Sequence, residues 1–280
     1  MLKQRLLTVA VALPVFLLAL FAAPATVWGA LLGVVSLVAA WEWAKLAGMS
    51  TLVSSVYIVI FAVVGMATYA LEVTQPGGLF ASAQGVLGYM LAIAFWVVWV
   101  PLWLRCGWRI TNPWWLGVFG LAALIPLWHA LFVLHAQPWK LLALMAVVWV
   151  ADTAAYAFGR MFGRRKLAPS ISPGKTWEGV AGATVMVLLY VYGLAVAYPT
   201  AFLGVAPMLG IGVMMLVLSV EGDLLESWLK RVAGVKDSGK LLPGHGGVLD
   251  RIDALAGALP IAVFVLWLLR SHSKLPSLIS

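Results

Sequence analysis

The sequence predicts an all-α polytopic membrane protein with about nine transmembrane helices. Of its 280 residues, 64% are apolar and only 10% are charged, and the mean hydropathy is +1.03. A soluble domain carries about 25% charged residues. Apolar runs also recur along the whole chain, each near the ~20 residues that a helix needs to cross a bilayer. Because no long stretch lacks such a run, we expect one integral membrane domain over residues 1–280.

Nine apolar runs account for the expected helices in chain order. Pro14, Pro126 and Pro260 fall inside runs, where neighbouring helices tolerate the kinks that proline causes. The first five runs form an N-terminal part, residues 1–137, and the remaining four belong to residues 138–280. The expected spans are about 6–22, 26–46, 52–71, 85–104, 114–134, 139–159, 178–198, 202–225 and 254–270.

The charges between these runs predict the orientation. Most Lys and Arg residues fall in alternate loops, and cytoplasmic loops of membrane proteins are rich in these residues. The C-terminal tail, with Arg270 and Lys274, then lies outside as a mild exception. The net charge of +8 is explained by such loops and by anionic lipid, so we expect no nucleic-acid partner. The single cysteine, Cys106, excludes an intramolecular disulfide.

Two polar segments, residues 152–178 and 221–253, interrupt this apolar chain. Together they hold eight of the ten carboxylates and ten of the eighteen Lys and Arg residues. Acidic residues contribute little to orientation, so topology alone does not require this concentration of both signs. Charges at membrane depth are costly and usually functional. We therefore expect a binding or active site in these segments, at the cytoplasmic face of the membrane.

Residues 221–253 place charged side chains on shared helical faces. Asp223, Ser227 and Arg231 recur every four residues, so they share one face if the eighth helix continues to Val232. Glu226 and Lys230 form a neighbouring row, which could be an ordinary ion pair.

Asp250 and Asp253 lie three residues apart at the start of the last helix. A carboxylate there can simply be a favourable partner of the helix dipole. That explanation covers one of the two, but not the facing Asp223 and Glu226. The preceding turn, Leu242–Gly247, surrounds His245 with glycines that let backbone amides approach an anion. Carboxylates beside such a turn predict a site for phosphates and for a hard cation such as Mg²⁺.

Residues 152–178 carry a second group of candidates. Asp152, Tyr156 and Arg160 share a helical face. The run SPGKTWE, residues 172–178, resembles a truncated phosphate loop, but it lacks the upstream glycine and a preceding strand. A Walker fold is therefore rejected. Lys175 and Thr176 at the start of a helix can still hold a phosphate.

Glu42, near the end of the second span, allows two interpretations. A carboxylate at membrane depth is a candidate functional group. Lys45 lies about one helical turn away, so a structural ion pair near the interface is equally compatible with the sequence.

Several of these motifs match a known family. The pattern from Ser227 to Asp253, SWLKR…KD…PGHGG…DRID, resembles the signature of the phosphatidate cytidylyltransferase (CDP-diglyceride synthetase) family over 27 residues with fixed spacing. Gly174 stands where a basic or polar residue is more usual. Four further blocks are similar to family blocks: Trp41–Trp43, Asp152–Arg160, Ser172–Gly179 and Glu221–Ser227.

The resemblance implies a nucleotidyltransferase of phospholipid biosynthesis, in the bacterial inner membrane. It would transfer the cytidylyl group of CTP to phosphatidate, giving CDP-diacylglycerol and pyrophosphate. It implies Mg²⁺, with K⁺ as a candidate second ion, and a homodimer. The implied metal ligands are Asp223, Asp250 and Asp253, and the other implied catalytic residues are Ser227, Lys230, Arg231, Asp237, His245 and Arg251, with Glu226 as a supporting ligand. The implied nucleotide-binding residues are Asp152, Lys175, Thr176 and Glu178.

The alternative is a membrane transporter of an ion or an anionic substrate. Polar residues beside kinked helices also describe a substrate pathway. Against it, the charges gather at one face and no inverted repeat is visible in the sequence. A scaffold that binds a partner through its loops would not need carboxylates on two helices.

Overall fold

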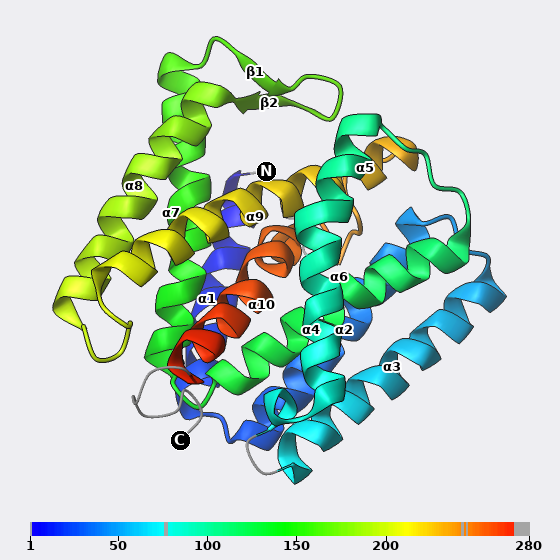
Figure 1. The fold of residues 1–280 in the computed structure, drawn as a ribbon. Helices are drawn as coiled ribbons and strands as arrows, with labels where there is room; N and C mark the ends of the chain where they lie inside the picture. Colours follow the sequence, from blue (N-terminus) through cyan, green and yellow to red (C-terminus); the bar gives the residue numbers. More distant parts are fainter. Residues whose placement is uncertain (1, 76–77, 242–243, 245, 272–280) are drawn as a thin grey trace.

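The computed structural model describes residues 2–75, 78–241, 244 and 246–271. Within these residues the chain forms nine long helices and one small β-hairpin (Figure 1). One of the nine helices is continuous from α4 through a π-helical segment into α5. The all-α prediction is confirmed for the membrane part, and the hairpin is an addition to it.

The N-terminal helices follow the expected runs closely. Asn112 caps α6 by accepting hydrogen bonds from the amides of Trp114 and Trp115, and Ser50 caps α3 in the same way through Val53. The elements are α1 (Leu2–Ala22), α2 (Ala25–Leu46), α3 (Thr51–Thr74), a 3₁₀ turn (Leu79–Ala81), α4 (Ala83–Ala94), the π-helical segment (Phe95–Trp99), α5 (Val100–Cys106) and α6 (Pro113–Leu134).

The C-terminal elements carry both polar segments. The elements are α7 (Pro138–Phe162), β1 (Lys166–Ala168), β2 (Ser172–Thr176), α8 (Trp177–Ala197), α9 (Val205–Val232) and α10 (Leu249–Ser271). The strands pair antiparallel, with Lys166 opposite Thr176 and Ala168 opposite Ser172. The expectation that no strand precedes the SPGKTWE run is wrong, because β1 lies before it and β2 covers Ser172–Thr176 itself. Pro and Gly disfavour strands, so no sequence pattern indicated β2, which is short and exposed only at Pro173 and Gly174.

Eight helices of the described chain are long and apolar enough to cross a membrane. They are α2, α3, the continuous helix Ala83–Cys106, α6, α7, α8, α9 and α10. The first expected span is a helix too, and its apolar part is Ala10–Ala22. The protein is thus a multi-pass membrane protein.

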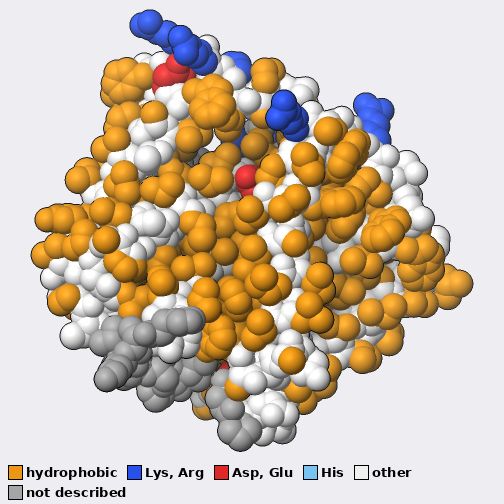
Figure 2. All heavy atoms as spheres, in the orientation of Figure 1, with side chains coloured by type: hydrophobic (Ala, Val, Ile, Leu, Met, Phe, Trp, Pro, Cys, Tyr) orange, Lys and Arg blue, Asp and Glu red, His pale blue; other side chains and the backbone are white. Residues whose placement is uncertain are grey.

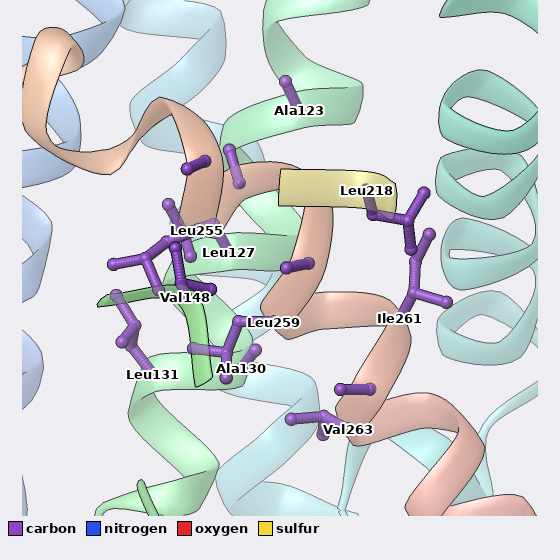
Figure 3. Packing of buried hydrophobic residues seen from close by; sticks show 14 of the residues in the cluster. Ala123, Leu127, Ala130, Leu131, Val148, Leu218, Leu255, Leu259, Ile261 and Val263 are labelled. Carbon is purple, nitrogen blue, oxygen red and sulfur yellow. The ribbon is translucent and has the colours of Figure 1, made fainter. Parts of the chain in front are cut away.

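Helix α10 lies at the centre of the packing. It contacts α6, α7 and α9, and also α2 and α4 from the N-terminal part. Figure 3 shows Leu255, Leu259 and Ile261 of α10 among apolar side chains of α6, α7 and α9. Helix α10, which begins with Asp250 and Asp253, is therefore positioned by helices from both parts of the chain.

Two glycines allow the backbones of α9 and α10 to touch where the helices cross. A Cβ on Gly222 would lie 2.2 Å from the carbonyl oxygen of Asp253, and a Cβ on Gly257 would lie 2.4 Å from that of Leu218. Small residues at helix crossings let backbones approach closely in membrane proteins. The crossing at Gly222 places the next residue, Asp223, beside the first turn of α10.

Candidate active site

Asp223 joins the two polar segments. Its Oδ2 atom lies 2.8 Å from Nζ of Lys175, at the end of β2. Its Oδ1 atom accepts a hydrogen bond from Ser227 Oγ at 3.2 Å, one turn along α9. Because α9 continues through Val232, the predicted shared face of Asp223 and Ser227 is confirmed.

Lys230 lies between two carboxylates from different helices. Its ammonium donates to Asp250 Oδ1 at 2.6 Å and also contacts Glu226. The Glu226 and Asp250 side chains are only 3% and 4% exposed. The predicted Glu226–Lys230 ion pair is therefore confirmed, and it extends across the helix crossing to α10. Removal of the lysine would leave two buried carboxyl groups without their cation, which is strongly unfavourable.

Asp250 also organises the loop before α10. Its Oδ2 atom accepts three hydrogen bonds: from Ser238 N at 2.9 Å, from Ser238 Oγ at 2.9 Å and from Gly247 N at 2.8 Å. With Lys230 on its other oxygen, both oxygens of Asp250 have protein partners. Gly246 has a positive φ of 81°, and a Cβ there would lie 2.7 Å from Asp250 Oδ2, so glycine permits this close loop.

Glu42 holds the same loop from the other side, although it lies about 200 residues earlier in the sequence. Its side chain is completely buried, and Oε2 accepts from Leu249 N at 2.8 Å and lies 3.2 Å from the Ser238 hydroxyl, whose single proton it shares with Asp250. Lys45 does not pair with it; the ammonium instead lies 3.3 Å from the centroid of the Trp41 ring. The interpretation of Glu42 as an ion pair with Lys45 is therefore wrong. Its carboxylate fixes the start of α10, and nothing in the local sequence indicated this partner.

Two further carboxylates, Asp152 and Asp253, lie near Asp223. Asp152 of α7, Asp223 of α9 and Asp253 of α10 lie close enough for their charges to interact. Lys175 and Arg251 act electrostatically on Asp152 with the opposite sign. Like charges at short range disfavour ionisation unless cations compensate for them. Four elements, α7, β2, α9 and α10, thus build a site suited to positive ions and phosphates.

The surface above this site is basic. In Figure 2, Lys and Arg side chains gather at the end of the molecule where Figure 1 shows the hairpin, and an acidic side chain is visible below them in a hollow. Most of the remaining surface in this view is apolar. This distribution agrees with a polar site at one end of a membrane-embedded bundle.

Comparison with known proteins identifies the relatives of this chain. The model of the cytidylyltransferase family matches residues 3–269. A phosphatidate cytidylyltransferase from Pseudomonas aeruginosa is 39% identical and covers 95% of this chain and 97% of its own length. The chain belongs to the cytidylyltransferase family. A phosphatidate cytidylyltransferase from Haemophilus influenzae is 34% identical over 93% of this chain and 96% of its own. One from Brucella suis is 50% identical over 41% of this chain and 42% of its own.

The carboxylates of this family member can be tested for their fit to Mg²⁺. Carboxylate oxygens are the hard ligands that Mg²⁺ takes together with phosphates. Asp223 fits best, since its side chain is 35% exposed and its contacts are one ammonium and one hydroxyl. Asp152 and Asp253 are its nearest acidic companions. Asp250 fits less well, because its oxygens already have four protein donors. As they stand, the described side chains include no group of three His, Cys, Asp or Glu with the geometry of a metal site.

Two predicted nucleotide-binding residues of the cytidylyltransferase have structural partners. Thr176 is buried and caps α8, accepting a hydrogen bond from Gly179 N at 3.1 Å. Glu178 accepts from the backbone amides of Arg164 and Arg165, so it fastens the start of the hairpin to α8. These contacts explain the local fold around Lys175, which does face Asp223.

The other predicted residues lie around the same end of the cytidylyltransferase. Asp237 is exposed on the loop beside Gly246. Arg251 is exposed at the start of α10. Arg231 donates through Nε to the carbonyl of Ile171 at 3.3 Å, in the turn of the hairpin. His245 lies outside the described residues.

Proposed function

We propose that this protein transfers the cytidylyl group of CTP to phosphatidate, which gives CDP-diacylglycerol and pyrophosphate. The observation that carries the proposal is the full-length similarity to phosphatidate cytidylyltransferases. The charged site supports it, because residues from both polar segments meet through Lys175 and Asp223. The protein is therefore a nucleotidyltransferase of phospholipid biosynthesis.

The chemistry suits such a site. A phosphate oxygen of phosphatidate attacks the α-phosphorus of CTP, and the bond to the β-phosphate breaks to release pyrophosphate. A phosphate monoester has a second pKa near ~6, so at neutral pH its attacking oxygen is already ionised and a strong base is unnecessary. Repulsion between the anionic reactants is the main obstacle. Positive groups fixed in position relieve that repulsion and align the reactants.

The site residues fall into two groups, one that binds phosphates and metal and one that completes and positions the site. Lys175 and Arg251 border the carboxylates Asp152, Asp223 and Asp253, and they contact the phosphates of the reactants. These carboxylates would hold Mg²⁺, with K⁺ as a candidate second ion, and a bound metal would supply positive charge to the phosphates. Lys230, Ser227, Asp237, His245 and Asp250 complete the site, with Lys230 and Asp250 positioning the loop before α10.

The charges of the loops indicate on which side of the membrane the site lies. The basic end of the bundle faces the cytoplasm, in agreement with the positive-inside rule. The protein resides in the bacterial inner membrane as a homodimer, with residues 138–280 as its catalytic part and residues 1–137 as supporting helices. Membrane lipid and the two substrates are its partners.

An assay with purified full-length protein tests the proposal. Labelled CTP and phosphatidate are mixed with the protein in detergent, with and without Mg²⁺, and label is followed into the lipid phase. We expect Mg²⁺-dependent lipid product. Absence of lipid product, together with flux of substrate into vesicles that contain the protein, would contradict the proposal and favour a transporter.

A further inference from the structure

A basic pocket lies between three elements that the proposed reaction does not use together. Its volume is about 390 Å³, and the end of α5, the turn of the hairpin and the end of α9 form its walls. Three arginines line it: Arg105, Arg109 and Arg231. We refer to it as the three-arginine pocket.

The backbone around this pocket is held in place by two indole groups. The carbonyl of Trp108 accepts hydrogen bonds from Trp103 Nε1 at 2.7 Å and from Trp228 Nε1 at 3.1 Å. Because Trp228 belongs to α9, the segment that follows α5 is fastened to that helix. Gly107 takes the left-handed conformation, with φ of 61°, that lets the chain turn there. Arg105 and Arg109, on either side of this turn, are thereby kept near α9.

The three arginines bring three positive charges to one pocket. Guanidinium groups stay charged at any physiological pH. None of the ten described residues that line the pocket is acidic. All ten carboxylate side chains of the protein lie in the described part of the chain, and none forms an ion pair with Arg105, Arg109 or Arg231. By contrast, Arg164 and Arg165 line a different pocket that contains a carboxylate, Glu178.

We infer that the three-arginine pocket binds a phosphate group, at a site separate from the carboxylates around Asp223. Guanidinium donates paired hydrogen bonds that match phosphate oxygens. Arg231 uses Nε on Ile171, which leaves its terminal nitrogens as further donors. Along α9, Arg231 lies eight residues beyond Asp223, a rise of about 12 Å.

The phosphate can come from two sources, a lipid headgroup or the phosphate chain of a nucleotide. The surroundings agree with headgroup depth, because Trp114 and Trp115 nearby in sequence are 56% and 59% exposed, and exposed tryptophans concentrate at the membrane interface. A phosphate chain is the other candidate, because it presents the same oxygens to guanidinium groups. Both sources share the chemistry of the site, and binding measurements distinguish them.

The test uses the purified full-length protein and the double variant Arg105→Gln/Arg109→Gln. Arg164→Gln/Arg165→Gln is the matched control, because it removes the same charge from exposed arginines at the same end. Binding of dioctanoyl phosphatidate, CTP and pyrophosphate is measured separately by calorimetry in detergent, without turnover. We expect the first variant to bind at least one probe about tenfold more weakly, since hydrogen bonds to charged groups are strong, and the control to bind as the parent does.

The pattern of loss identifies the source. Weaker phosphatidate binding alone indicates a lipid headgroup, and weaker CTP and pyrophosphate binding indicates the nucleotide chain. Equal losses in both double variants, or no loss in either, would overturn the inference. If the first variant does not fold, Arg105→Lys/Arg109→Lys keeps the charge, loses the paired geometry and must still show weaker binding. Because binding is measured without catalysis, the result does not depend on the proposed transferase activity.

Discussion

Two polar groups at different places in the bundle differ in burial and in how completely the protein pairs their polar atoms. In one, His129 lies between Glu72 and Tyr89: its Nε2 is 3.0 Å from Glu72 Oε2, and its Nδ1 is 2.7 Å from the Tyr89 hydroxyl. Glu72 also accepts from Leu79 N at 2.7 Å. His129 is fully buried. These polar atoms find their partners within the protein, so we call this group closed. It links α3, α4 and α6.

The group around Asp223 is built differently. Asp152, Asp223 and Asp253 interact electrostatically with one another, and the Asp223 and Lys175 side chains are 35% and 22% exposed. A buried polar group whose partners are all supplied by the protein stabilises a fold. A partly open group with unbalanced charge is suited to bind charged ligands. Variants in both places test this difference between the closed group and the partly open group, and the largest effect is expected at Lys230.

Lys230→Met should destabilise the protein more than any other change considered. It leaves Glu226 and Asp250 buried without their shared cation, which costs about 3–5 kcal/mol in the free energy of unfolding. Thermal unfolding in detergent measures this loss. Glu226→Gln in the same chain removes one of the two carboxyl groups that Lys230 contacts, so the double variant should recover part of the stability. No recovery would mean that the three side chains do not act as a unit.

Asp223→Asn should lower turnover about 10²–10³-fold, the scale seen when one preorganised electrostatic contact is lost. Its stability should change little, since the side chain is partly exposed and an amide keeps the hydrogen bond from Ser227. Initial rates of CDP-diacylglycerol formation and the unfolding temperature are compared with those of the parent protein. Near-normal turnover would remove Asp223 from the catalytic centre.

Glu42→Gln should weaken the loop before α10 by about 1–3 kcal/mol, because the Leu249 amide and the Ser238 hydroxyl both contact Oε2 and would lose a charged acceptor. Turnover should fall with it, as Ser238 and Asp250 lose their common support. Hydrogen exchange of the Leu249 amide and initial rates report the two effects. Lys45→Met is the control and should alter neither, since Lys45 contacts Trp41 instead.

Tyr89→Phe should have the smallest effect, about 1 kcal/mol in stability from one lost hydrogen bond to His129. Turnover per folded molecule should match that of the parent protein, because the closed group has no part in the reaction. Rates are divided by the folded fraction found by size-exclusion chromatography. A specific loss of turnover would show that this group is coupled to the active site.

Local patterns in the sequence predicted a large part of this structure. Hydropathy located the long helices because each span must satisfy its own backbone in lipid. Helical periodicity predicted the contacts of Asp223 with Ser227 and of Glu226 with Lys230, which depend only on spacing along one helix.

Contacts between distant segments escaped prediction. Lys175 meets Asp223 across 48 positions of the numbering, and Glu42 meets Leu249 across 207. Such pairs depend on how helices pack, and no periodicity encodes packing partners. The different surroundings of Asp250 and Asp253 also could not be read from their spacing, because Asp250 receives its donors from the loop at Ser238 and Gly247.

The glycine at position 222 has a wider consequence. It has no side chain to contribute to chemistry, yet its bare backbone rests against the carbonyl of Asp253 and so sets how far apart two acidic residues stand. An added methyl group would act as a spacer and would have to push the helices apart. The spacing of the acidic residues thus depends on the absence of a Cβ atom at position 222. A search for inactivating substitutions should include this glycine as well as the ionisable side chains.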